Sequence, residues 1–118
     1  MESLADEYLS QCRNNYINKI TPSGPHSLKN EGYAKLVAIA QSFFNSNRTE
    51  EFSGFFQEPQ YLVNLWTAHL LIEYGHPSSI LKGQALVIIK RYSEGALDPR
   101  LADEEKKWIE TNHPELLR

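Results

Sequence analysis

The stretch of residues 60–74 carries only one residue that is charged at neutral pH, Glu73. Pro59 precedes it and Gly75 follows it, which is the placement expected at the first helical position and just past the last one. Leu, Ile, Val and Trp residues leave this predicted helix with little polar face. A helix that is apolar on most sides must be covered on most sides. We therefore predict that it lies at the centre of the fold.

Amphipathic helices are predicted on both sides of this central one, because apolar residues recur there every three or four positions. Ser3 and Asp6 have the spacing of a capping box, and Asp98-Pro99 is typical of a helix start. No alternating run of β-branched residues is long enough to indicate a sheet. We expect one all-α domain, residues 1–118, of about six helices, the other five near residues 3–20, 28–44, 49–56, 78–92 and 98–111.

The inward faces of two of these helices can be assigned from the same periodicity. In the first helix, Cys12 belongs to an apolar stripe that also includes Tyr8 and Tyr16. In the helix near residues 78–92 we expect Ile80 and Ile89 to face the core together.

Composition excludes several function classes. The 118 residues hold 12 Lys and Arg against 15 Asp and Glu, a net charge of −3. Basic residues are scattered, whereas nucleic-acid binding needs a basic stripe, so we predict no nucleic-acid partner. No window approaches the roughly 18 apolar residues of a membrane span. The acidic residues 1–7 do not resemble a signal peptide, and the one cysteine fits a reducing compartment, so we expect a cytoplasmic protein without a membrane partner.

The residue types that carry chemistry do not form a recognisable catalytic motif. His69 and Glu73 have i, i+4 spacing, but the second histidine of a zinc-protease helix is missing. We expect His69 to be partly buried and hydrogen-bonded to Glu73, and Cys12 to be a buried, unreactive thiol. His26, His76 and His113 each neighbour a proline and are predicted at turns or helix ends. We therefore predict no enzyme activity, no cofactor and no metal; a small enzyme that uses His69 and Glu73 is the less favoured reading.

Two acidic groups and two tyrosines are the candidate partner-binding residues. Carboxylates at helix starts stabilise the positive end of the helix dipole, and the same carboxylates can meet a basic partner surface. Tyrosine is a common interface anchor. The candidates are Glu50, Glu51, Glu58, Asp103, Glu104, Glu105, Tyr61 and Tyr74.

Residues 58–75, EPQYLVNLWTAHLLIEYG, resemble the first helix of a HEAT-like repeat, and residues 80–92 would be its partner helix. Asn64 departs from the arginine that such repeats favour, and no second copy recurs at about 40 residues. Together with IIKRYS at residues 88–93 and KKWI at 106–109, this stretch also looks like small bacterial HEAT-like proteins of the DUF2019 type. Related short helical proteins include immunity proteins of polymorphic or contact-dependent growth-inhibition toxins.

This resemblance implies a HEAT-like α–α superhelix and a non-catalytic protein that binds one cognate bacterial toxin domain and neutralises it. In that reading, a helical scaffold presents carboxylates and tyrosines to a basic toxin surface. The alternative is a HEAT-like adaptor or assembly subunit with no link to a toxin.

Overall fold

The computed structural model describes residues 3–117, which form helices joined by turns and contain no strand. Residues 1, 2 and 118 lie outside the described residues, so the acidic N-terminal stretch is described only from Ser3. Within the described chain, the predicted all-α class is confirmed. The α-helices are α1 (Leu4–Ile17), α2 (Glu31–Asn45), α3 (Thr49–Ser53), α4 (Val63–Tyr74), α5 (Ser79–Ser93) and α6 (Pro99–Asn112), and short 3₁₀ helices lie at Ser27–Lys29, Gly54–Gln57, Gln60–Leu62 and Pro114–Leu117.

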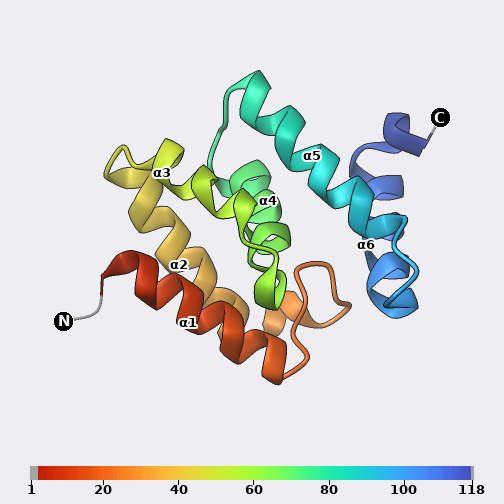
Figure 1. Cartoon of the computed structure of the whole chain (residues 1–118), viewed down its shortest axis with the longest axis horizontal. Helices are drawn as coiled ribbons and strands as arrows, with labels where there is room; N and C mark the ends of the chain where they lie inside the picture. Colours follow the sequence, from red (N-terminus) through yellow and green to blue (C-terminus); the bar gives the residue numbers. More distant parts are fainter. Residues whose placement is uncertain (1–2, 118) are drawn as a thin grey trace.

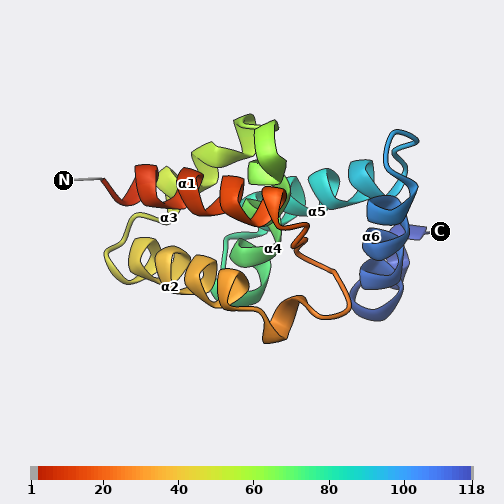
Figure 2. The same cartoon turned by 90° about the horizontal axis from the view of Figure 1, so that it is seen from below.

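Helix α4 is the centre of the molecule, as its composition predicts. It packs against α1, α2 and α3 on one side and against α5 on the other (Figure 1). All of residues 65–71 are buried, so no side of the helix reaches water over two turns. Turned by 90°, the molecule shows α1 and α2 stacked at one end and α6 at the other (Figure 2). The longest dimension, 44 Å, runs between these ends.

Two separate apolar cores lie on either side of α4. The N-terminal core joins α1, α2, α3 and α4, and Trp66 of α4 is among its fully buried residues. The C-terminal core joins α4, α5 and α6, and Leu65 of α4 is fully buried within it. Because adjacent residues of α4 enter different cores, the helix holds the two halves of the chain together.

The predicted helix starts are confirmed at both ends of the chain. The Ser3 hydroxyl accepts a hydrogen bond from the Asp6 amide at 3.1 Å, and the Asp6 side chain accepts one from the Ser3 amide, which completes the capping box. At α6, the Asp98 side chain accepts from the Leu101 amide and Pro99 occupies the first turn.

Three details differ from the sequence prediction. Helix α4 begins at Val63 and not near Pro59, because Tyr61 and Leu62 adopt left-handed backbone angles with φ of 54° and 60°. Thr49, whose residue type and position predict the cap of the short helix near residues 49–56, lies instead in the first turn of α3, and Arg48 is the cap residue. Ile80 is 72% exposed, since the first turn of α5 extends beyond the helices that cover the rest of it.

The buried thiol and the turn histidines agree with prediction. Cys12 is fully buried in the N-terminal core, and this burial raises the pKa of its thiol to about 12. His26 and His113 are cap residues, and His76 lies in the turn between α4 and α5 with a φ of 46°. Every helix among residues 3–117 is too short or too polar to span a bilayer. The finer HEAT-like arrangement stays a prediction.

The two isoleucines of α5 test this description of the cores. Ile89 is fully buried, so Ile89→Ala should lower the free energy of unfolding by about 2–5 kcal/mol. Ile80→Ala removes the same atoms from an exposed site and should change it by less than about 0.5 kcal/mol. Urea denaturation followed by circular dichroism measures both. Equal losses for the two variants would contradict the assignment of α5's buried face.

Candidate functional site

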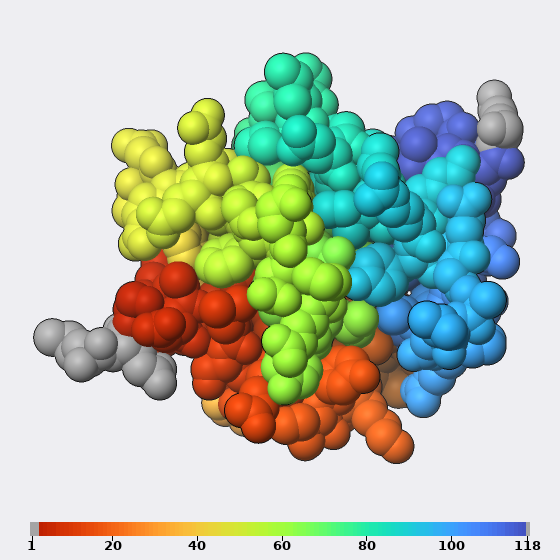
Figure 3. Space-filling model, viewed as in Figure 1, coloured from red at the N-terminus to blue at the C-terminus, as the bar shows by residue number. Residues whose placement is uncertain are grey.

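The main surface hollow lies where the two halves of the chain meet. Two adjoining cavities of about 370 and 570 Å³ share Tyr16, Leu62, Asp98 and Leu101 as lining residues, and we call the combined hollow the inter-core groove. Figure 3 shows this face, hollowed between the end of α1, the segment before α4 and the start of α6. The apolar lining consists of Tyr16, Ile20, Leu62, Tyr92, Leu97 and Leu101, and the charged lining of Lys19, Arg91, Asp98, Arg100 and Glu104.

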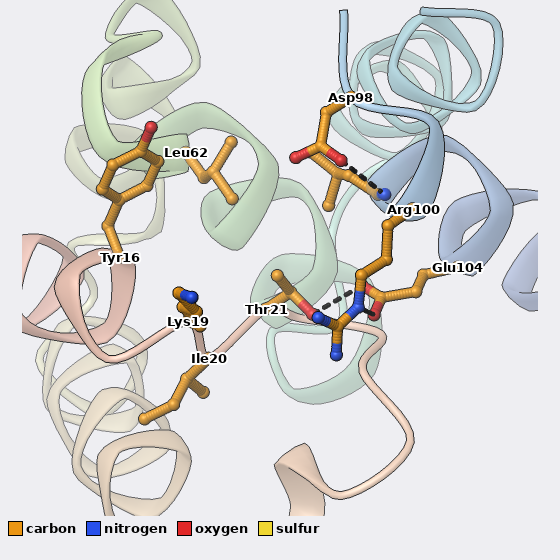
Figure 4. A pocket seen from close by; sticks show the side chains of 9 residues that line it. Tyr16, Lys19, Ile20, Thr21, Leu62, Asp98, Arg100 and Glu104 are labelled. Atoms are coloured by element: carbon orange, nitrogen blue, oxygen red, sulfur yellow. Dashed lines mark hydrogen bonds and ion pairs between the residues drawn. The ribbon is translucent and has the colours of Figure 1, made fainter.

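One wall of the groove follows from the way α1 ends. The Ile20 amide donates to the Asn15 carbonyl at 2.8 Å and the Lys19 amide to the Tyr16 carbonyl at 3.1 Å, which is the Schellman pattern. This pattern places Lys19 in the left-handed region, with a φ of 60°. Glycine or asparagine usually occupies such a position, because a side chain there costs about 1–2 kcal/mol. The helix therefore ends three residues earlier than predicted, with Lys19 beside the groove (Figure 4).

The floor of the groove is formed by Tyr61 and Leu62, the two left-handed residues before α4. Leu62 packs against both cores, so its side chain is fixed between the two halves of the chain. Tyr61 stacks edge-on against Tyr16, with the ring centres 5.6 Å apart. Two consecutive non-glycine residues in the left-handed region cost of the order of 1–3 kcal/mol each. The surrounding packing holds this strain directly beneath the groove.

The opposite wall is formed by the first two turns of α6, which a hydrogen bond ties to the loop after α1. The Thr21 hydroxyl donates to Glu104 Oε1 at 2.6 Å, and Arg100 Nε lies 3.8 Å from Glu104 Oε2 (Figure 4). Asp98 is occupied as the cap of α6. Both walls are therefore fixed by contacts within the chain.

Behind this wall lies a buried ionisable pair. His69 Nε2 of α4 is 2.5 Å from Glu105 Oε1 of α6, and the two residues are 3% and 0% exposed. The rings of His69 and Trp108 pack nearly perpendicular to each other, with their centres 4.6 Å apart. His69 Nδ1 and Glu105 Oε2 have no hydrogen-bond partner among the described residues. The pair joins α4 to α6 across the C-terminal core.

The geometry of this pair differs from that of a catalytic triad. The Ser23 hydroxyl lies 3.3 Å from His69 Nε2, the same nitrogen that faces Glu105. In a serine–histidine–acid triad the hydroxyl and the carboxylate use opposite ring nitrogens, so that the imidazole can take a proton from one while the other orients it. The contacts therefore position the loop after α1 and do not form a relay.

The predicted contact between His69 and Glu73 is wrong. Glu73 is exposed and accepts hydrogen bonds from the Tyr33 hydroxyl at 3.1 Å and from Trp108 Nε1 at 3.3 Å. His69 and Glu73 lie one turn apart on the same face of α4. The His69 ring meets the buried carboxylate of Glu105 instead, and Trp108 of α6 contacts both His69 and Glu73. Tyr74, a candidate partner-binding residue, belongs to this second cluster, with its hydroxyl 3.3 Å from that of Tyr33.

The first acidic group, Glu50, Glu51 and Glu58, is divided between two places in the structure. Glu50 and Glu51 lie on α3, at the opposite end of the molecule from α6 (Figure 1), and Glu51 pairs with Arg48 at 2.5 Å. Glu58 and Tyr61 line a separate hollow of about 290 Å³ next to the groove. The structure therefore brings Glu58 and Tyr61 near the groove and leaves Glu50 and Glu51 far from it.

The second acidic group is formed by Asp103, Glu104 and Glu105 of α6, and their side chains point in three different directions. Asp103 faces water and pairs with Lys107 at 3.0 Å, whereas Glu104 lines the groove. Glu105 is fully buried, so its assignment to a partner-binding surface is wrong. Consecutive residues of a helix point about 100° apart. Of these three side chains, that of Glu105 points into the core.

The groove residues Lys19, Leu62, Arg91, Leu97 and Arg100 were not predicted. Leu97 could have been predicted as an exposed apolar residue, because it is a large apolar side chain in a turn between Gly95 and Pro99. In the structure it is fully exposed. The others carry no such signal, since their positions depend on how the two halves of the chain meet. Within residues 3–117, no group of three or more His, Cys, Asp or Glu side chains is arranged to hold a metal ion.

No protein-family profile matches the chain, and neither a curated protein nor a solved structure is significantly similar to it.

Neighbouring carboxylates of α6 provide a test of the buried pair. Glu105→Ala leaves His69 buried without its partner and should lower the free energy of unfolding by about 3–5 kcal/mol. Glu105→Gln retains the size and a hydrogen-bonding group, so it should lose less. Asp103→Ala, from an exposed pair, should leave the urea midpoint nearly unchanged. If Glu105→Ala behaves like Asp103→Ala, the pair does not hold α6 in place.

Proposed function

We propose that this protein is a non-catalytic binding module whose inter-core groove holds a segment of a partner protein. The observation that carries the proposal is the combination of exposed apolar side chains with fixed walls. Tyr16 is 52% exposed and Leu97 fully exposed, at the edge of a hollow whose sides are secured by the Schellman turn and the Thr21–Glu104 hydrogen bond. Exposed apolar groups gathered in a concave site are typical of an interaction surface.

We further propose that the partner is a cognate bacterial toxin domain and that the protein acts as its immunity protein. The support for this step is the resemblance of residues 58–75 and of the segments after them to small bacterial HEAT-like proteins. A scaffold with walls already fixed pays little conformational entropy on binding, which favours a tight complex. By occupying the toxin's active site or its route to substrate, such a complex would block the toxin without any chemistry.

The proposal predicts that the protein encoded directly upstream carries the toxin domain, and co-expression with that upstream toxin domain tests it. A stable complex on gel filtration and protection of cells from the toxin are the expected results. Leu97→Asp places a charge at a site without packing contacts to lose and should weaken the complex about tenfold or more, which corresponds to about 1.4 kcal/mol. Ile80→Asp, at an exposed site away from the groove, should bind as the unchanged protein does.

Two results would count against the proposal. If no complex forms and the cells are not protected, the immunity function is wrong. If a complex forms and Leu97→Asp and Ile80→Asp bind equally well, the partner uses a surface other than the groove.

A further inference from the structure

The charge of the inter-core groove is opposite in sign to that of the whole chain. Three cations, Lys19, Arg91 and Arg100, and two anions, Asp98 and Glu104, line it, which gives 3 − 2 = +1 against −3 for the chain. A locally positive hollow in an acidic protein attracts negative groups and repels positive ones.

Both anions of the groove are already used within the chain. Glu104 accepts from the Thr21 hydroxyl and lies near Arg100, and Asp98 caps α6. The positive end of the α6 dipole also acts on Asp98. These carboxylates therefore have little free capacity to receive a basic partner.

Two of the cations, in contrast, are not paired with a carboxylate. Neither Lys19 nor Arg91 has a carboxylate oxygen within 4.0 Å in the described part of the chain. Both residues are exposed, and they line the two adjoining cavities of the groove. A ligand that lies along the groove would meet both of them.

The backbone conformation of Lys19 is unusual for a lysine. Helix α2 ends in the same Schellman pattern as α1, and there the left-handed residue is Asn47, with a φ of 59°. Asparagine adopts this conformation more readily than lysine does. Lys19 thus adopts an unfavourable backbone conformation without forming an ion pair inside the described chain. Its ammonium is therefore available to a group outside the chain.

We propose that the inter-core groove recognises an acidic amphipathic segment of the partner protein. Carboxylates on one face of the segment meet Lys19 and Arg91, and apolar side chains on its other face pack against Tyr16, Leu62 and Leu97. This is the arrangement of a helix laid in a groove, in which apolar anchors supply affinity and charges supply orientation and specificity. The inference rests on the proposed function and identifies the chemistry of the partner's contact surface.

The inference reverses the charges expected from sequence. From sequence, carboxylates of this protein are expected to meet a basic surface of the toxin. In the structure the accessible carboxylates of the groove wall are engaged, and the unpaired charges of the groove are positive.

Lys19→Gly separates binding from folding. Glycine relieves the left-handed strain, so the urea midpoint of this variant should rise, while the loss of the ammonium should weaken binding about three- to tenfold. Asn47→Gly is the matched control, because it places glycine at the equivalent position of the other Schellman turn, far from the groove. It should leave binding unchanged. Arg91→Gln should add to the loss caused by Lys19→Gly.

Two probes keep this test independent of the proposed function. The first is the upstream toxin domain, with binding measured by calorimetry at low and high salt. The second is a synthetic 14-residue amphipathic helix with leucines on one face and glutamates on the other, compared with its lysine counterpart. The glutamate peptide should bind at least tenfold more tightly than the lysine peptide, and its amide shift changes in an NMR titration should gather at Tyr16, Lys19, Leu97 and Arg100. Added salt should weaken both complexes.

The outcomes distinguish failure of the inference from failure of the proposed function. If the toxin domain binds and Lys19→Gly and Arg91→Gln bind it as tightly as Asn47→Gly does, the inference is wrong and the proposed function stands. If the toxin domain does not bind but the glutamate peptide occupies the groove, the immunity function is wrong and the groove's preference is supported. Preference for the lysine peptide, or tighter binding of a single-stranded DNA oligonucleotide than of the glutamate peptide, would overturn the inference.

Discussion

The rest of the structure depends on the need to bury a helix that has no polar side. Helix α4 cannot leave any face in water without exposing Leu, Trp or Ile side chains, so the helices on both sides of it in sequence must close over it. The N-terminal and C-terminal cores are the two halves of that cover. The inter-core groove lies at the surface where the end of α1 faces the start of α6, and the Thr21–Glu104 hydrogen bond joins the two halves there.

The buried contact between His69 and Glu105 determines how α6 is positioned relative to α4. Apolar packing alone specifies an approximate position, since it has little directional preference. His69 and Glu105 add a direction, because a buried ionisable pair is tolerated only when its partners meet closely. The same turn of α6 carries Glu104 to the groove, where it holds the loop after α1. The shape of the groove therefore follows from contacts in the core beneath it.

Sequence patterns predicted the parts of the fold that depend on local chemistry. The capping box at Ser3, the Asp98-Pro99 start of α6, the burial of Cys12 and the central position of α4 all follow from residue types at short spacing. Exposure of Ile80 could not be predicted in this way. Its periodic position agrees with a buried face, and only the extent of the covering helices determines that the first turn of α5 is uncovered.

The candidate site was less predictable, for the same physical reason. The partner of His69 comes from 36 residues further along the chain, and i, i+4 spacing favours the nearer Glu73 instead. Acidic residues at helix starts have an intrinsic role in helix stability, so their charge alone does not reveal which of them reach a partner. Lys19 and Leu62 shape the groove through left-handed backbone conformations, and neither residue type has a local preference for that conformation that would reveal it in the sequence.

Amide hydrogen exchange of the free protein and of its complex with the upstream toxin domain tests the central claim most directly. If the inter-core groove is the binding surface, amides in residues 16–21 and 96–101 should exchange more slowly in the complex, while those of α3 exchange as before. Slower exchange confined to α3 and to the exposed turns of α6, with the groove unchanged, would contradict this account.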